Sequence, residues 1–194
     1  MYHVHKKYVY YTYTTNRRYT MKYQILTDET KFHNGVTLHR IQSLRNFGRI
    51  KIGDKGGWIE KESNLSQYGS AWIYGNAKVY GDAWVSGNAK VYGYAWVRGN
   101  AKVYDDAKVY GDAVVYDKAE VYGNSEVYGD SHVYDNAKVY GYAKVLGDAK
   151  VYEDAEVYGT AWIYDSARVY GNARVFGNAV VSGYGEVNGY TEVF

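Results

Sequence analysis

A six-residue repeat runs without insertion or deletion from Ala71 to Phe194, and it constrains the fold of this chain more than any other feature. A Val or Ile stands at every sixth position from Ile73 to Val193, and a small residue, usually Ala, stands two positions before each of them. Residues two apart on an extended strand point to the same side, so Ala and Val share one face of each short strand. The departures from Ala are small or short as well: Ser125, Ser131, Gly185 and Thr191.

Each repeat therefore predicts one short strand followed by one corner. Gly-Asn or Gly-Asp usually follows the strand, and this pair suits a turn with positive φ. A helix is excluded because a period of six does not map onto 3.6 residues per turn. A meander of antiparallel hairpins is disfavoured because such short strands would leave long edges and an apolar face without a second layer. The pattern thus favours a parallel β-solenoid.

The spacing of charged and aromatic residues indicates that three repeats, or 18 residues, form one coil. Every eighteenth residue just before one core Val alternates in charge: Lys102, Glu120, Lys138, Glu156, Arg174 and Glu192. The residue just after the same Val is always aromatic: Tyr104, Tyr122, Tyr140, Tyr158, Phe176 and Phe194. Coils stacked about 4.8 Å apart would place each charge between two opposite charges and would stack the rings.

The Val-x-x-x-Ala-x spacing resembles the hexapeptide repeat of left-handed parallel β-helix proteins, best known from trimeric acyltransferases. The lead-in GGWIEKESNLSQYGSAWIYGNAKVYGDA is similar to uncharacterised repeat proteins of bacteria and their phages, some labelled acyltransferase-like or polymer-forming. The resemblance covers about residues 21–194 and implies a left-handed, triangular coil. Tyr mostly stands where that family prefers Gly, Ala, Glu or Asp after the core aliphatic residue. We therefore expect an all-β protein, a single-stranded parallel β-helix with a small N-terminal β cap.

The chain is expected to contain three segments. Residues 1–20 are basic and rich in Tyr, and we interpret them either as a disordered upstream extension or as an arm that grips an anionic partner. Residues 21–70 are expected to form the cap and a transition coil, with a hairpin whose turn is Asn34-Gly35. Residues 71–194 are expected to form the solenoid, about seven coils long.

Composition narrows the function classes. The chain has no Cys, which excludes disulfides and thiolate chemistry, and no apolar run approaches the length of a membrane span, about 18 residues. Without the continuous apolar stretch of a signal peptide, a cytoplasmic location is expected, and the phage resemblance adds virion association. Residues 1–57 hold 11 Lys or Arg and 3 Asp or Glu, whereas the rest is acidic, so nucleic-acid binding is disfavoured on the rod.

Two kinds of chemistry have candidate residues. The resemblance to acyltransferases implies a catalytic histidine between subunits, and the single solenoid histidine, His132, is the base to test if the protein is an enzyme. The register also stacks Asp117, Asp135 and Glu153 at one corner, which are weak candidates for a Ca²⁺ site. A surface histidine and turn-capping acidic residues explain both observations without catalysis or metal, so we expect neither a cofactor nor a metal.

The remaining candidates are aromatic residues that could mediate contacts between proteins. Trp72, Trp84 and Trp96 stand near the first coils, one on each face, where they could anchor the cap or another chain. Tyr is a favoured interface residue, so the aromatic column from Tyr104 to Phe194 could mediate side-by-side packing. We expect a non-catalytic scaffold that self-associates through a rod face or through the last coil. An acyltransferase-like enzyme and an anion- or nucleic-acid-binding module that uses the basic head are the alternatives.

Overall fold

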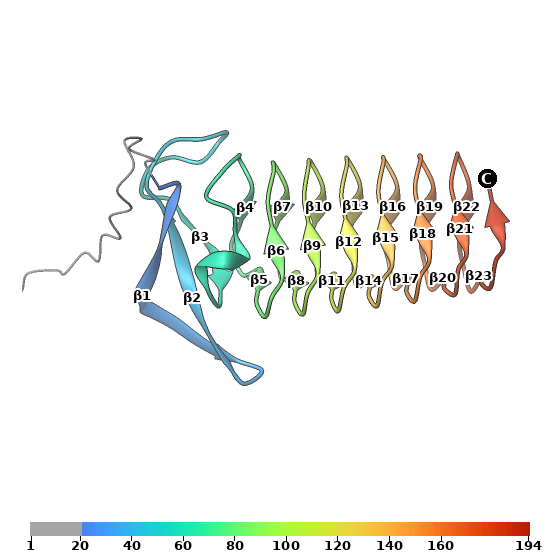
Figure 1. Ribbon diagram of the computed structural model, residues 1–194, viewed down its shortest axis with the longest axis horizontal. Coiled ribbons are helices and arrows are strands. Elements are labelled where there is room, and N and C mark those ends of the chain that lie inside the picture. Colours follow the sequence, from blue (N-terminus) through green and yellow to red (C-terminus); the bar gives the residue numbers. More distant parts are fainter. Residues whose placement is uncertain (1–20) are drawn as a thin grey trace, which may run out of the picture.

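A computed structural model of the protein describes residues 21–194, and the expected N-terminal arm, residues 1–20, lies outside the described residues. The chain forms a straight rod of stacked triangular coils with a β cap at one end (Figure 1). This all-β parallel solenoid confirms the predicted fold class. Apart from one short 3₁₀ turn, η1 (Glu62–Asn64), the regular elements in this range are strands.

Three sheets run along the rod, one on each side of the triangle. The hairpin face contains β1 (Tyr23–His33), β2 (Val36–Ser43), β3 (Lys55–Ile59), β5 (Lys78–Val79), β8 (Trp96–Val97), β11 (Val114–Val115), β14 (His132–Val133), β17 (Lys150–Val151), β20 (Arg168–Val169) and β23 (Glu186–Val187). The ladder face contains β6 (Trp84–Val85), β9 (Lys102–Val103), β12 (Glu120–Val121), β15 (Lys138–Val139), β18 (Glu156–Val157), β21 (Arg174–Val175) and β24 (Glu192–Val193). The Trp72 face contains β4 (Trp72–Ile73), β7 (Lys90–Val91), β10 (Lys108–Val109), β13 (Glu126–Val127), β16 (Lys144–Val145), β19 (Trp162–Ile163) and β22 (Val180–Val181).

The coil length of 18 residues is confirmed by the strand register. Lys102 pairs with Glu120, Val103 pairs with Val121, and the same offset holds on all three sheets from β4 onward. Backbone hydrogen bonds join each coil to the next, such as the bond from Lys102 N to Ala119 O at 2.9 Å. Each coil therefore depends on its two neighbours, as in other stacked-repeat proteins.

The core of the rod consists of the Ala and Val columns. From Ala71 to Val175 these side chains are almost completely buried. The two exceptions at the Ala position inside this range, Ser125 and Ser131, are buried as well. The Ser125 hydroxyl donates to Tyr122 O at 2.8 Å, and the Ser131 hydroxyl donates to Tyr128 O at 2.9 Å. The small polar residues are therefore tolerated because a carbonyl oxygen of the preceding corner accepts the hydroxyl proton.

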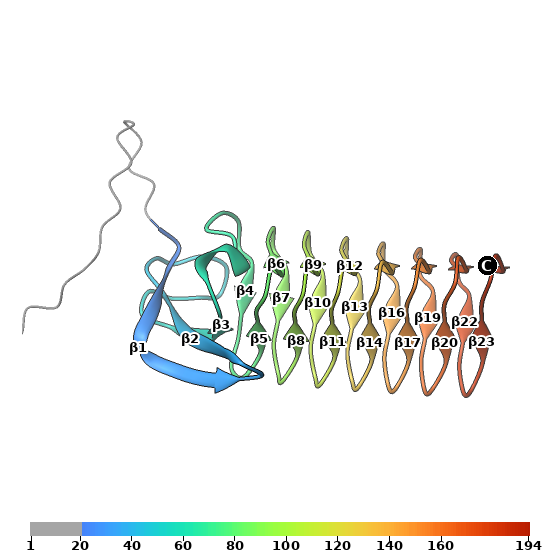
Figure 2. The same ribbon diagram turned by 60° about the horizontal axis from the view of Figure 1, so that its bottom comes forward.

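The cap begins with the predicted hairpin, whose strands β1 and β2 join at Asn34 and Gly35 with φ values of 47° and 84°. Two residues with positive φ are typical of the tight turn that Asn-Gly favours. The register of the hairpin shifts between Leu26 and Thr30, and β1 bends there. This bend carries the tip of the hairpin alongside the first coils of the rod (Figure 2).

The first coil is longer than the others and links the cap to the regular rod. Ile59 pairs with Val79 and Leu65 bridges to Val85, each 20 residues on, whereas Ile73 pairs with Val91, 18 residues on. The two additional residues lie between Leu65 and Ile73. This arrangement confirms the interpretation of Ile59 and Leu65 as a transition coil that is out of phase with the later repeats.

Candidate interaction surface

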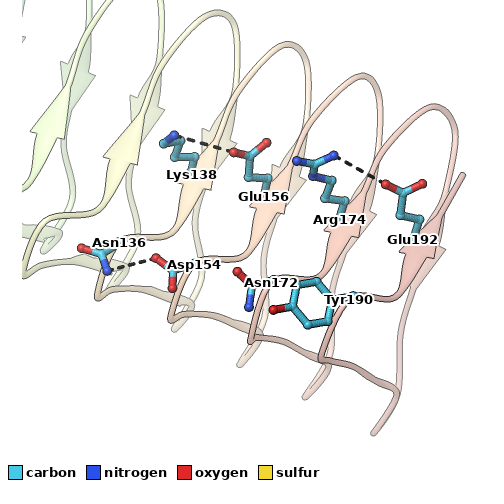
Figure 3. A pocket seen from close by; sticks show the side chains of 8 residues that line it. All are labelled: Asn136, Lys138, Asp154, Glu156, Asn172, Arg174, Tyr190 and Glu192. Carbon is cyan, nitrogen blue, oxygen red and sulfur yellow. Dashed lines mark hydrogen bonds and ion pairs between the residues drawn. The ribbon is translucent and has the colours of Figure 1, made fainter.

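The six alternating charges form a column on the ladder face, one from each coil between β9 and β24. Lys102 Nζ lies 2.9 Å from Glu120 Oε1, Lys138 Nζ lies 3.6 Å from Glu156 Oε1, and Arg174 Nη1 lies 3.6 Å from Glu192 Oε1. Figure 3 shows the last two of these couples. Each charge has opposite charges in the register above and below it, as predicted, but within residues 21–194 the ion pairs join the six side chains in three separate couples.

A tyrosine hydroxyl completes two of these couples. Tyr104 Oη donates to Glu120 Oε2 at 3.1 Å, and Tyr140 Oη donates to Glu156 Oε2 at 3.2 Å. Although burial alone would raise the pKa of Glu120, hydrogen bonds from Lys102 and Tyr104 outweigh it and lower that pKa. Burial raises the pKa of Tyr104, and the neighbouring Glu120 raises it further. The charges and rings therefore form one hydrogen-bonded surface with fixed side-chain positions.

The aromatic column beside the charges is a continuous stack. The rings of Tyr104, Tyr122, Tyr140 and Tyr158 follow one another at centroid distances of 4.9 Å, with interplanar angles of 4° or less. Phe176 and Phe194 extend the stack at 5.0 and 5.7 Å. Stacking in register stabilises neighbouring coils and also produces a flat aromatic stripe. At the end of the stripe the Phe194 side chain is 85% exposed.

A polar groove runs along the other side of the charge column. It has a volume of about 550 Å³. It lies between the charged residues and the preceding corner, where Asn136, Asp154, Asn172 and Tyr190 are stacked (Figure 3). A second hollow of about 430 Å³ continues it toward the cap, along Asn100, Lys102, Lys118 and Glu120. The ladder face therefore presents three parallel columns, which are polar, charged and aromatic.

The three tryptophans near the first coils have different surroundings. Trp72 is 1% exposed and packs edge-on against Tyr23 and Phe47, so it anchors the cap and offers no surface to a partner. Trp96 contacts the hairpin, as described next. Trp84, at the cap end of the charge column, is 42% exposed. Of the three, Trp84 is the one that the structure leaves free to contact a partner on the ladder face.

The hairpin is held against the rod by a row of cations and aromatic rings. Arg40, Trp58, Lys78 and Trp96 pair in sequence across β2, β3, β5 and β8. The Arg40 guanidinium lies 5.0 Å from the Trp58 ring, and the Lys78 ammonium lies 4.9 Å from the Trp96 ring. At the hairpin tip, the ring of His33 packs edge-on against Trp96 at 4.6 Å. Cation–π contacts of this kind stabilise partly desolvated cations, so the row fastens the hairpin to the first coils.

The sequence reasoning missed this row and also missed a buried lysine in the cap. Lys22 is fully buried, and its ammonium donates to Ala71 O at 2.9 Å. Burial lowers the pKa of Lys22 to about 8, and Arg45 lowers it further. The row becomes visible in the sequence only when Trp58 is aligned with Lys78, which requires the 20-residue length of the first coil.

His132 has the surroundings of a surface residue. Its ring is partly exposed and packs edge-on against Tyr116, with a centroid distance of 6.2 Å. Burial lowers the pKa of His132, and Lys150 and Arg98 lower it further. The structure prints no carboxylate hydrogen bond for His132 among the described residues, and therefore no group that would orient it as a general base.

The acidic corner residues act as backbone caps. Asp117, Asp135 and Glu153 all have φ values of 57°, and Asp135 Oδ2 accepts a hydrogen bond from Glu153 N at 3.1 Å. Asp105 and Asp165 cap Gly123 N and Gly183 N in the same way. Within residues 21–194 no group of three His, Cys, Asp or Glu side chains has the arrangement of a metal site.

The comparisons with known proteins concern the repeat. A family model described as the YdcK β-solenoid repeat matches residues 71–87 and 167–183, near the two ends of the regular rod. This similarity and the geometry together place the chain among β-solenoid repeat proteins. No curated protein matches the chain. Residues 21–194 also contain no helix with the length and hydrophobicity of a membrane span.

Proposed function

We propose that this protein is a non-catalytic scaffold that assembles with a second copy of itself through the ladder face. The observation that carries the proposal is the order of that face: charged and aromatic side chains stand in fixed, exposed columns over six consecutive coils. Fixed aromatic and charged side chains lose little conformational entropy on binding, which favours their use in an interface.

The other two faces are less suited to this role. The hairpin tip covers the start of the hairpin face, where it packs on Tyr80 and Trp96. On the Trp72 face the outward position changes from Trp72 through two lysines to Glu126, so its charges do not alternate. The ladder face therefore combines exposure with regular charge alternation.

Light scattering on a sizing column, over a hundredfold range of protein concentration, tests the proposal. We expect an assembly of at least two copies, and we expect Tyr140→Asp to shift it to the monomer because this change places a carboxylate in the centre of the stripe. Tyr134→Asp is the matched control: Tyr134 is stacked between two rings at 4.8 and 4.9 Å, but on the hairpin face. A parent protein that is monomeric throughout, or two variants that behave alike, would contradict the proposal.

The alternative functions gain less from the geometry. An acyltransferase site between subunits, which the hexapeptide-repeat resemblance and its left-handed coil imply, would have to use His132, and the described residues provide it with no catalytic partner. An anion-binding head would use cations such as Lys31 and Lys78, whose ammonium groups already lie over Trp58 and Trp96. Neither alternative therefore displaces the scaffold as the proposed function.

A further inference from the structure

The sign pattern of the ladder face specifies how a second copy would lie on it. We infer that two copies pack ladder face to ladder face with their rods antiparallel, centred between the Lys138 and Glu156 levels. This inference rests on the proposed function, and it adds the orientation and the residue pairs of the interface.

The argument begins with symmetry. In a two-fold dimer, any contact between residue i and residue j occurs twice, so the surface must be complementary to itself. A two-fold axis in the interface plane and perpendicular to the rod reverses the order of the coils, and each column then faces the same column of the partner. The charge column would pair Lys102 with the partner's Glu192, Glu120 with the partner's Arg174 and Lys138 with the partner's Glu156.

All three pairs join opposite charges because the column alternates and has an even number of members. A parallel dimer in register instead places like charges at the same level along the rod, which is unfavourable. The couples within each chain can persist, since Glu120 and Glu156 use two oxygens while each lysine has three ammonium protons to donate.

The polar column beside the charges leads to the same orientation independently. The same axis would pair Asn100 with the partner's Tyr190, Lys118 with the partner's Asn172, and Asn136 with the partner's Asp154. Each of these pairs joins groups that can donate and accept hydrogen bonds, and none joins two like charges. Parallel packing in register would bring two copies of Lys118 to one level and two copies of Asp154 to another.

The aromatic column is compatible with this axis. It would place Tyr104 over the partner's Phe194, Tyr122 over the partner's Phe176 and Tyr140 over the partner's Tyr158. Six coils at about 4.8 Å each give the face a length of about 29 Å, which corresponds to about 1,000 Å² of surface buried by the pair. That area lies at the lower limit for a specific interface, so we expect a weak dimer that dissociates on dilution.

Cross-linking can test the orientation because the chain contains no Cys. Lys102→Cys and Glu192→Cys introduce thiols at half-exposed positions. In the antiparallel dimer these two thiols face each other across about 10 Å, the distance between packed sheets, whereas two copies of the same variant hold their thiols about 24 Å apart along the rod. We therefore expect a thiol-specific cross-linker with a reach of about 10 Å to join the mixed variants and to leave each variant alone uncoupled.

Lys90→Cys mixed with Val180→Cys provides the matched control, since these residues occupy the same first and last coils on the Trp72 face. Cross-linking of single variants would overturn the antiparallel orientation in favour of a parallel one. A dimer in light scattering that cross-links only through the control pair would overturn both the orientation and the ladder-face interface. Protein that is monomeric at every concentration would overturn the proposed scaffold function itself.

Discussion

The glutamates in the outward strand positions organise the surface at the scale of single residues. Glu126 on the Trp72 face repeats the arrangement of the ladder face: its Oε1 accepts from Lys108 Nζ at 2.7 Å and its Oε2 accepts from Tyr110 Oη at 3.0 Å. The hydrogen bond from Lys108 is the main reason that the pKa of Glu126 is lowered, and it outweighs the effect of burial. A lysine, a tyrosine two residues later and a glutamate one coil further thus form one unit.

Glu126→Gln is expected to lower the free energy of unfolding by about 1 kcal/mol at pH 7, because it removes the ion pair and weakens the acceptor for Tyr110. A lowered native pKa stabilises the fold above the pKa of unfolded Glu, about 4.3, and this contribution is lost as the pH falls through the native pKa. The difference between variant and parent should therefore shrink in acid, as measured by urea unfolding. Glu192→Gln, whose neighbour Phe176 lacks a hydroxyl, should cost less, and equal costs would contradict the role of the tyrosine.

The sequence predicted the charge order but not these contacts. Strand register follows from the 18-residue period alone, so the levels of Lys102 and Glu120 could be predicted. The tyrosine bonds depend on side-chain rotamers: the hydroxyl of Tyr104 reaches the carboxylate of the next coil and not a residue of its own coil. Periodicity contains no information on that choice, since both directions preserve the same stacking.

At the scale of elements, the β1–β2 hairpin is fixed to the rod by its tip. Trp96→Ala should release the tip, because it removes the ring that contacts both His33 and Lys78, while the outward position leaves the core of the coil intact. We expect hydrogen exchange of the backbone amides in residues 30–37 to become several-fold faster without a change elsewhere in the rod.

Trp84→Ala is the matched control for this prediction, since it removes a tryptophan of a neighbouring strand for which the structure prints no contact with the hairpin. Equal exchange in the two variants would show that the tip is held by other contacts. The turn of this hairpin was predictable from Asn34-Gly35, but its position was not, because the bend between Leu26 and Thr30 has no signal in the hydrophobic pattern.

At the scale of the whole molecule, the rod is a one-dimensional stack whose spacing is set at the corners. The period of the repeat was sufficient to predict the solenoid, the coil length and the core columns, since each repeat states the same local rule. It was not sufficient to predict which face would be covered by the cap, because Arg40 and Trp58 meet Lys78 only through the longer first coil. The irregular part of the chain therefore determines which faces of the regular part remain exposed.

Fixed spacing leads to a prediction about two glycines that share one conformation. Gly129 and Gly75 both have positive φ, but a Cβ on Gly129 would lie 2.8 Å from Gly147 N in the next coil, whereas a Cβ on Gly75 would meet nothing within 4 Å. Gly75→Ala should therefore cost only the backbone strain, about 1–2 kcal/mol. Gly129→Ala should cost clearly more, because the obstructing atoms belong to a backbone that cannot move without lengthening the coil-to-coil hydrogen bonds on either side.

The form of the unfolding curve should differ as well as its midpoint. Because each coil contacts only its neighbours, a weakened junction at Gly129 divides the rod into two parts that can unfold separately. Urea unfolding followed by circular dichroism should then broaden or split for Gly129→Ala and stay a single transition for Gly75→Ala. Equal destabilisation with unchanged curves would mean that neighbouring coils can separate locally at little cost, and the stacked backbone would then not be what holds the surface columns in register.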